Sequence, residues 1–328
     1  MGRTTMDGKA MGVSARLPRL VVSAGNVYRR ALAAVLGVLG PEVAYAITER
    51  MSLWLYRLLD PLRLTVEAQA RAALGDRLSA DQIDRIARRS VVHRVWNLVD
   101  LMLADRLLHP GTYRRYGGQL AEPHRSELLD AHRRGQAAIL VTCYYGPYDL
   151  LPVFLGYNGV RATAVYRPHE NRSYDAYRRR IRARSGCRLV EVPDALARAE
   201  QVLGSGGMFA LVADHQAPRH GVETTFLGLP TVARRTVGIL AVRHGADVVV
   251  AGIRRTGRPF RFEIVVGETI EKEEWSGQSD PVEYITRRYL RGLERIVLED
   301  PSQYPWGIPR WGQDRLARLL GDIAPANA

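Results

Sequence analysis

The sequence AAILVTCYYGPYD, at residues 137–149, places a short apolar run directly before a polar turn. A run of this length that ends at a turn is typical of a buried parallel strand, and Gly146-Pro147 marks the turn. A helical pattern then covers 149–155. The order strand, turn, helix predicts one unit of an α/β sheet.

Five further apolar runs follow, each short enough for a strand, with helical patterns between most of them. The predicted strands cover 162–166, 188–192, 208–213, 247–253 and 260–266, and the predicted helices cover 174–185, 195–204, 235–244 and 282–299. This alternation predicts an α/β fold with a central, mostly parallel sheet flanked by helices and joined by right-handed crossovers.

The chain divides into three predicted regions: an N-terminal helical, membrane-associating segment at 1–120, the α/β domain at 121–315 and a C-terminal tail at 316–328. The longest uncharged apolar run near the start covers only 31–41, well short of the roughly 20 residues that a membrane-spanning helix needs. No secretory signal is expected, because a charged region, an apolar core and a cleavage site do not stand together there.

Two helical patterns in the N-terminal segment have an apolar face. The first carries Met51, Trp54, Leu55, Leu58 and Leu59 on one side, with Arg50, Arg57 and Asp60 on the other. The second runs over 83–108 behind a cap at 79–81 and carries Val92, Val95, Trp96, Val99 and Leu103. Both fit ordinary core helices, and both also fit helices that lie in the bilayer interface with arginines at the headgroups.

The charge of the chain is strongly basic. Forty-seven Lys and Arg stand against 34 Asp and Glu, for a net charge of +13, and only Lys9 and Lys272 are lysines. Such a balance favours an anionic partner, which is a phospholipid surface, a nucleic acid or an acidic carrier protein. The two cysteines, Cys143 and Cys187, lack the spacing of a zinc site or a disulfide framework, so we expect reduced, buried thiols and no bound metal.

Polar side chains follow three of the predicted strands at their carboxyl ends, where open α/β sheets bind ligands. They are Tyr144, Tyr145 and Asp149 after the first strand, Arg167 and His169 after the second, and Asp214 and His215 after the fourth. An acid and a base that meet at such an edge are a plausible catalytic site. We therefore expect residues 144, 167 and 214 to converge at a common rim that faces an apolar groove.

Four sequence blocks carry a resemblance to a known family. They are TCYYGPYDL at 142–150, VYRPHEN at 165–171, VADHQAPRHGVETTFLGLPTVARRT at 212–236 and DPSQYPWGIPRW at 300–311. In this order and spacing, residues 20–312 resemble the bacterial lipid A acyltransferases (lauroyl and myristoyl transferases), within the wider glycerolipid and lysophospholipid acyltransferases. Gly146 and Asp149 match the first motif, but Tyr144 stands where the family has its motif His, and Ile308 stands where a second His is expected.

The resemblance implies transfer of an acyl group from a thioester of acyl carrier protein or coenzyme A to a lipid or glycolipid hydroxyl, with no cofactor. It also implies a location on the cytoplasmic face of the plasma membrane. In the family, the motif His deprotonates the acceptor and the motif carboxylate orients it. Because a tyrosine has a pKa of about 10, Tyr144 would need about 4 kcal/mol of differential stabilisation to act as that base near pH 7.

Several assignments of the base remain open. Tyr144 is a candidate hydrogen-bond donor to substrate, with Asp149, His215 or His169 as the base. Cys143 is a candidate acyl-accepting nucleophile, although no adjacent base is visible. The chain is alternatively a degenerate family member that binds lipid or acyl chains without transfer.

Each remaining candidate has a structural interpretation beside the functional one. Asp149 and Asp214 fit catalysis, a helix N-terminus or an internal ion pair, and Arg167 fits a phosphate or oxyanion contact or a salt bridge. Tyr145, Gly146, Arg234 and Arg235 are predicted to bind substrate or an anionic headgroup. The arginine-rich stretch at 178–184 fits a surface for carrier protein or lipid, or solvated charge. Nucleic-acid binding rests on charge alone, without a supporting motif, and is not expected.

Overall fold

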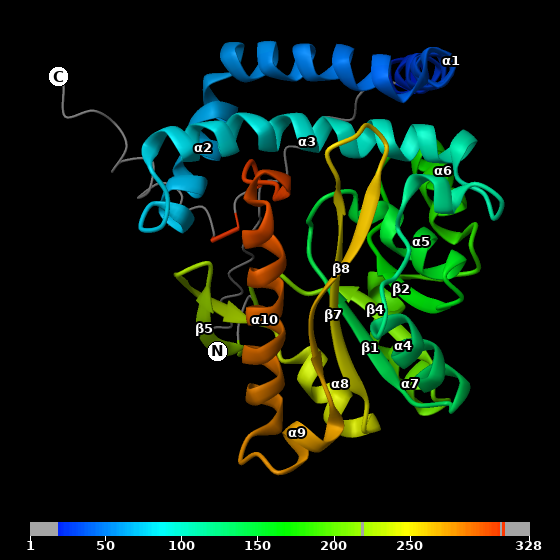
Figure 1. Cartoon of the computed structure of the whole chain (residues 1–328), viewed down its shortest axis with the longest axis vertical. Helices are drawn as coiled ribbons and strands as arrows, with labels where there is room; N and C mark the ends of the chain where they lie inside the picture. Colours follow the sequence, from blue (N-terminus) through cyan, green and yellow to red (C-terminus); the bar gives the residue numbers. More distant parts are fainter. Residues whose placement is uncertain (1–18, 218–219, 309, 312–328) are drawn as a thin grey trace, which may run out of the picture.

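The computed structural model describes residues 19–217, 220–308 and 310–311 (Figure 1). The predicted tail at 316–328 and the first 18 residues of the predicted N-terminal segment lie outside the described residues. The α-helices are α1 (Arg19–Leu58), α2 (Asp60–Leu74), α3 (Ala80–Leu107), α4 (His124–Arg133), α5 (Leu151–Tyr157), α6 (Arg172–Ala183), α7 (Ala195–Gly204), α8 (Thr236–His244), α9 (Lys272–Ser276) and α10 (Pro281–Glu299). The strands are β1 (Ala138–Thr142), β2 (Ala162–Tyr166), β3 (Arg188–Glu191), β4 (Met208–Val212), β5 (Val222–Phe226), β6 (Leu229–Ala233), β7 (Asp247–Arg255) and β8 (Phe262–Ile270).

A six-stranded sheet forms the centre of the molecule, in the order β3-β2-β4-β1-β7-β8. Its neighbouring strands are parallel except β7 and β8, which run antiparallel. The predicted mostly parallel α/β sheet is therefore confirmed. The strand predicted at 260–266 lies at Phe262–Ile270 and is the antiparallel edge strand.

The apolar run that predicts β1 is buried on both faces of the sheet. Ile139 and Val141 join a core cluster that includes side chains of α7, α8 and α10. Ala138 and Leu140 join a second cluster with side chains of α4, α5 and α6. Successive side chains of a strand point to opposite faces, and both faces here carry helices, so every position of the strand is buried, including Thr142 at its end.

The helices α1, α2 and α3 form a layer across one end of the sheet, with α1 outermost and α3 between α1 and the sheet (Figure 1). At Gly40 (φ 82°) and Pro41 the helix α1 is kinked. The α3 pattern predicted at 83–108 is confirmed as a core helix, because Ile83, Val92 and Trp96 are buried. None of the helices in the described part of the chain combines the length and apolarity that crossing a bilayer requires.

A buried polar cluster fastens α3 to the end of β7. The guanidinium of Arg255, of which 2% is exposed, pairs with the fully buried Asp100 and also donates to the Asn97 amide oxygen. Asp100 accepts a further hydrogen bond from the Tyr45 hydroxyl of α1. One buried arginine thus joins the sheet to both α3 and α1.

Candidate active site

The carboxyl ends of β2, β4 and β1 lie next to one another, because these strands are adjacent and parallel. Thr142 at the end of β1 is in register with Val212 at the end of β4. The segments that follow bring Tyr144, Arg167 and Asp214 close enough for both charges to act on the Tyr144 hydroxyl. The predicted rim is therefore present, and Tyr144, Arg167 and Asp214 meet there.

Asp214 is a buried carboxylate with one satisfied oxygen and one unsatisfied oxygen. Its side chain is 4% exposed, and its Oδ2 accepts a hydrogen bond of 3.0 Å from the Tyr304 hydroxyl. Its Oδ1 has no hydrogen-bond partner within the described residues and lies 3.8 Å from Nδ1 of His215. A buried acceptor without a partner costs free energy, so Oδ1 is available to a donor that approaches from the imidazole side.

His215 lies half-exposed at the same rim, between Asp214 and Tyr144. Its side chain is 49% exposed, and its ring packs edge-on against the Tyr144 ring with 5.1 Å between centroids. Partial burial lowers the pKa of His215 below its usual 6.5, and Asp214 opposes this shift. The imidazole is therefore neutral at pH 7 and able to accept a proton.

Tyr144 is a hydrogen-bond donor at neutral pH. Burial and the nearby Asp214 carboxylate raise its pKa above the usual 10, and the surrounding arginines lower it only in part. Its ring also packs edge-on against Tyr148 at 4.8 Å. Because the shift is opposite to the one a phenolate base needs, Tyr144 does not replace the missing histidine as base.

Asp149, the motif carboxylate, is paired with arginines of α6 and not with an imidazole. Its side chain is 10% exposed and lies 3.2 Å from Nη2 of Arg178, and it also pairs with Arg182. Asp149 belongs to a short 3-10 turn, Tyr148–Leu150, and makes no helix-capping hydrogen bond. Its charge therefore serves to hold two guanidinium groups, one of them buried, against the rim.

Several arginines of the stretch at 178–184 make contacts within the protein, whereas the sequence suggested solvated charge or a surface for carrier protein or lipid. Besides the two arginines on Asp149, Arg184 donates to the carbonyl oxygen of Ala104 at 2.6 Å. Arg180 pairs with Asp105 at 2.6 Å. These contacts dock α6 on the last turn of α3.

Three further guanidinium groups lie near enough to His215 for their charges to act on it. Arg167, Arg234 and Arg310 each lower the pKa of His215, and Arg310 also lies over the Phe226 ring at 4.3 Å. Arg235 points elsewhere, because its guanidinium pairs with Asp280 at 3.4 Å. The rim therefore presents cations around one neutral imidazole, an arrangement suited to an anionic substrate or a developing oxyanion.

Two of the predicted residues, Tyr145 and Gly146, do not present a functional group to the rim, and His169 makes its contacts within its own loop and with α6. Tyr145 is 1% exposed, and its side chain belongs to the core. Gly146 has φ +54°, and a Cβ there would lie 2.1 Å from the carbonyl oxygen of Ile253, so the glycine permits close approach of two segments. His169 accepts a hydrogen bond from the Asn171 amide at 3.0 Å and packs against Tyr174.

Cys143 is unsuited to nucleophilic catalysis. Its side chain is fully buried, and burial raises the pKa of its thiol well above the usual value. A thiol is nucleophilic as the thiolate, which this environment disfavours. Within the described residues, no group of three or more His, Cys, Asp or Glu side chains is arranged to hold a metal ion.

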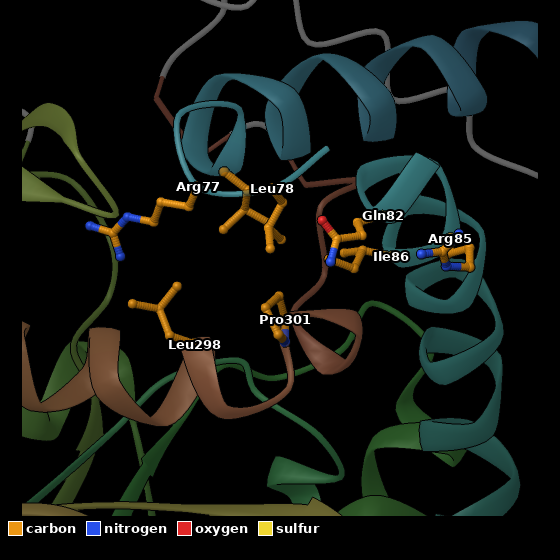
Figure 2. A pocket seen from close by; sticks show the side chains of 8 residues that line it. Arg77, Leu78, Gln82, Arg85, Ile86, Leu298 and Pro301 are labelled. Atoms are coloured by element: carbon orange, nitrogen blue, oxygen red, sulfur yellow. The ribbon is translucent and has the colours of Figure 1, made fainter. Parts of the chain in front are cut away.

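A cavity of about 490 Å³ lies away from the predicted site residues, between α2, α3 and the end of α10. Figure 2 shows Leu78 and Leu298 facing each other across it, with Gln82, Ile86 and Pro301 on a third side. None of its lining residues was predicted as a site residue. The apolar groove expected at the rim is not this cavity.

Sequence reasoning missed the roles of Tyr304, Arg310, Arg178 and Arg182. Tyr304 and Arg310 belong to the closing segment, which α2 holds in place: the Gln69 side-chain oxygen accepts from the Arg310 amide at 2.9 Å. The spacing of 178 and 182 by one helical turn places both arginines on one face of α6, a signal that was present in the sequence.

Comparison with known protein families identifies a match over most of the chain. The model of the family described as bacterial lipid A biosynthesis acyltransferase matches residues 22–313, which include the whole sheet and every residue of the rim. No curated protein sequence matches the chain.

Proposed function

Because the chain belongs to the bacterial lipid A biosynthesis acyltransferase family and is an acyltransferase of that type, we propose that it acylates a lipid or glycolipid hydroxyl with His215 as general base. The donor is an acyl thioester of acyl carrier protein or coenzyme A. The enzyme works at the cytoplasmic face of the plasma membrane as a peripheral or monotopic protein. One observation carries the assignment of the base: the unpartnered Asp214 Oδ1 lies 3.8 Å from His215 Nδ1.

The reaction follows from this pair. The neutral imidazole of His215 takes the proton of the acceptor hydroxyl as its oxygen attacks the thioester carbonyl carbon. The positive charge that forms on the ring strengthens its interaction with Asp214. When the C–S bond breaks, the sulfur leaves as a thiolate and takes the proton back from the imidazolium, which yields the ester and a free thiol.

The cations at the rim support the charge that develops on the carbonyl oxygen. Arg167, Arg234 and Arg310 are close enough to His215 to shift its pKa. Guanidinium groups that are already in place when an oxyanion forms stabilise it without reorganisation. The same cations favour approach of the anionic thioester donors, while the Tyr144 hydroxyl donates a hydrogen bond to substrate.

The outward face of α1 supports the membrane association. Ile47, Met51, Trp54 and Leu58 recur at intervals of three or four residues, and their exposed fractions are 40%, 53%, 62% and 57%. The opposite face of α1, with Tyr45, is buried against α3. An exposed apolar stripe on an outermost helix fits insertion into the bilayer interface. The rim lies beside the layer of α1, α2 and α3, because Arg94 of α3 is near Tyr148, which packs against Tyr144.

The test compares two histidines that follow neighbouring strands of the sheet, His215 after β4 and His169 after β2. With a radiolabelled acyl thioester and membrane lipid in detergent micelles, we expect His215→Gln to lose about 10²- to 10⁴-fold in transfer rate. The matched control His169→Gln keeps the wild-type rate, because the His169 ring packs against Tyr174. Wild-type transfer by His215→Gln contradicts the assignment. Retention of lipid by the wild-type protein without any transfer would favour the binding-only alternative.

A further inference from the structure

A second cavity, here called the arginine crevice, opens between α1, α2 and α3 with a volume of about 510 Å³. Its charged lining comprises Arg57, Arg63, Glu67, Asp84, Arg85, Arg88 and Arg89. Five arginines thus face two carboxylates. The crevice is distinct from the rim, because none of these residues follows a strand of the sheet.

Ion pairs neutralise only part of this charge. Arg88 pairs with Asp84 at 2.6 Å, Arg63 pairs with Asp60 at 2.7 Å, and Arg89 pairs with Glu49. Glu67 accepts a hydrogen bond of 2.7 Å from a tyrosine of α1 and forms no ion pair with a residue that the structure describes. Among the described residues, this leaves Arg57 and Arg85 without an ion pair against the single carboxylate of Glu67, so the crevice keeps a small surplus of positive charge.

Unused donors remain in the crevice. Within the described residues, Arg57 and Arg85 form no ion pair or hydrogen bond, and Nε of Arg63 is buried without a partner. Arg85 also lines the cavity of Figure 2, so its guanidinium stands between the two cavities. Guanidinium groups bind phosphate oxygens through paired N–H donors, which makes a phosphate the anion that best fits this arrangement.

The position of the crevice points to a phosphate that belongs to a lipid. Arg57 follows Trp54 by three residues, so it lies on the flank of the exposed stripe of α1 and not on the opposite side, as the sequence pattern suggested; Leu53 of the same helix lines the crevice. When an amphipathic helix lies in the interface, arginines on its flank reach the level of the headgroups. An acidic carrier protein would not require an apolar stripe beside the arginines.

We propose that the arginine crevice binds the phosphate of an anionic membrane phospholipid while the stripe of α1 enters the same leaflet. This site rests on the membrane association proposed above, but it is separate from the transfer reaction. It selects the lipid composition on which the enzyme docks.

The experiment measures binding to two kinds of vesicle, zwitterionic phosphatidylcholine alone and phosphatidylcholine mixed with phosphatidylglycerol. The wild-type protein should bind the mixed vesicles more tightly. Because each arginine at an anionic surface contributes about fivefold to binding, Arg57→Gln with Arg85→Gln should lose about 30-fold in affinity for mixed vesicles and nothing for phosphatidylcholine.

The matched control, Arg125→Gln with Arg133→Gln on α4, removes the same charge away from the crevice and should bind as wild type. Arg57→Lys with Arg85→Lys keeps the charge and should recover only part of the binding.

Each outcome separates the crevice from the proposed function. Equal binding of the wild-type protein to both vesicles overturns the crevice and leaves membrane association intact, whereas binding to neither removes both. Equal losses in the crevice and α4 double variants reduce the effect to net charge and overturn the site. If inorganic phosphate, at the same phosphate concentration as the lipid, displaces the protein from the mixed vesicles, the crevice binds a free anion and not a lipid. Loss of carrier-protein binding in Arg57→Gln with Arg85→Gln, without a vesicle effect, would assign it to an acidic protein. Acyl transfer in micelles, measured in parallel, reports the reaction independently.

Discussion

The Tyr304 hydroxyl donates a hydrogen bond of 3.0 Å to Oδ2 of Asp214 and so ties the closing segment of the chain to the end of β4. The bond occupies the far oxygen of the carboxylate and leaves Oδ1 on the side of His215. Because Tyr304 is itself fully buried, burial and Asp214 raise the pKa of its hydroxyl, which remains a donor throughout the working range. The orientation of Asp214 is thus set by a residue 90 positions away.

Asp214→Asn should lower the transfer rate by at least about 10²-fold, because the amide cannot balance the charge on the imidazolium. Asp214 raises the pKa of His215 against the effect of burial. Its removal therefore lowers that pKa, and the acid limb of the kcat/KM profile should move to lower pH. The control is Asp280→Asn, which removes a carboxylate paired with Arg235. An acid limb that stays at the wild-type pH would exclude Asp214 as the partner of His215.

Tyr144→Phe should keep the transfer rate within about tenfold, since the phenol donates one hydrogen bond and is not the base. Tyr144→His restores the residue that the family motif carries, yet we expect no gain in rate. The motif carboxylate Asp149 is already paired with Arg178 and Arg182 and is not free to orient a new imidazole. Steady-state rates of both variants in micelles check this. A rise above the wild-type rate in Tyr144→His would show that the ancestral site is still competent.

Asp149→Asn should destabilise the fold by about 3–5 kcal/mol, because it leaves a buried guanidinium without a counter-charge. The side chains of Asp149 and Arg182 are each 10% exposed. Chemical denaturation measures the loss as a lower midpoint at an unchanged slope. The matched control is Asp60→Asn. Asp60 pairs with Arg63 at the surface, so this substitution should change the free energy of unfolding by less than about 1 kcal/mol. Equal stability of the two variants would contradict a structural role for Asp149.

The parallel sheet was predictable because its strands are buried on both faces and appear as continuous apolar runs, as at β1. The hairpin of β5 and β6 was not predicted. Val222–Phe226 is mostly polar, and the turn uses Leu227 at φ 52° with Gly228 at φ 78°, without the usual Asn-Gly signal. The Glu294 carboxylate of α10 accepts the Leu227 amide, a long-range contact that no local pattern contains.

The rim was predictable for the same reason as the sheet, since the carboxyl ends of adjacent parallel strands meet. The pairing of its charges was not. Asp149 lies 29 positions from Arg178 in the sequence, and their contact depends on how α6 docks against α3. The direction in which the pKa of Tyr144 shifts likewise depends on burial of its side chain, which a single sequence does not reveal.

His93 should make the fold sensitive to acid. Burial, with the nearby Arg255 and Arg89 charges, lowers its pKa from 6.5 to about 2. Below about pH 6.5, His93 therefore binds a proton in the unfolded chain but stays neutral in the folded chain. The free energy of unfolding consequently declines as the pH falls from about 6.5 toward 2. The loss from this group approaches about 1.4 kcal/mol per pH unit. In His93→Gln, denaturation midpoints measured between pH 7 and 4 should fall less steeply than in the wild-type protein. Parallel declines in the two proteins would contradict this role.

Trp54→Ser with Leu58→Ser should weaken binding to phosphatidylcholine vesicles by at least about 100-fold, since burying each large apolar side chain contributes about 1.5–3 kcal/mol. Both side chains are more than half exposed, so their removal leaves the core unchanged and the unfolding midpoint should stay near that of the wild-type protein. The matched control is Val192→Ser with Leu196→Ser. Val192 lies just before α7 and is 46% exposed, and Leu196 lies in the first turn of α7 and is 60% exposed. Vesicle flotation measures all three proteins. Since α1 is the outermost helix of the layer above the rim, loss of flotation should be accompanied by loss of transfer to lipid in vesicles but not in micelles (Figure 1). Equal flotation of the α1 variant and the control would show that another surface meets the membrane.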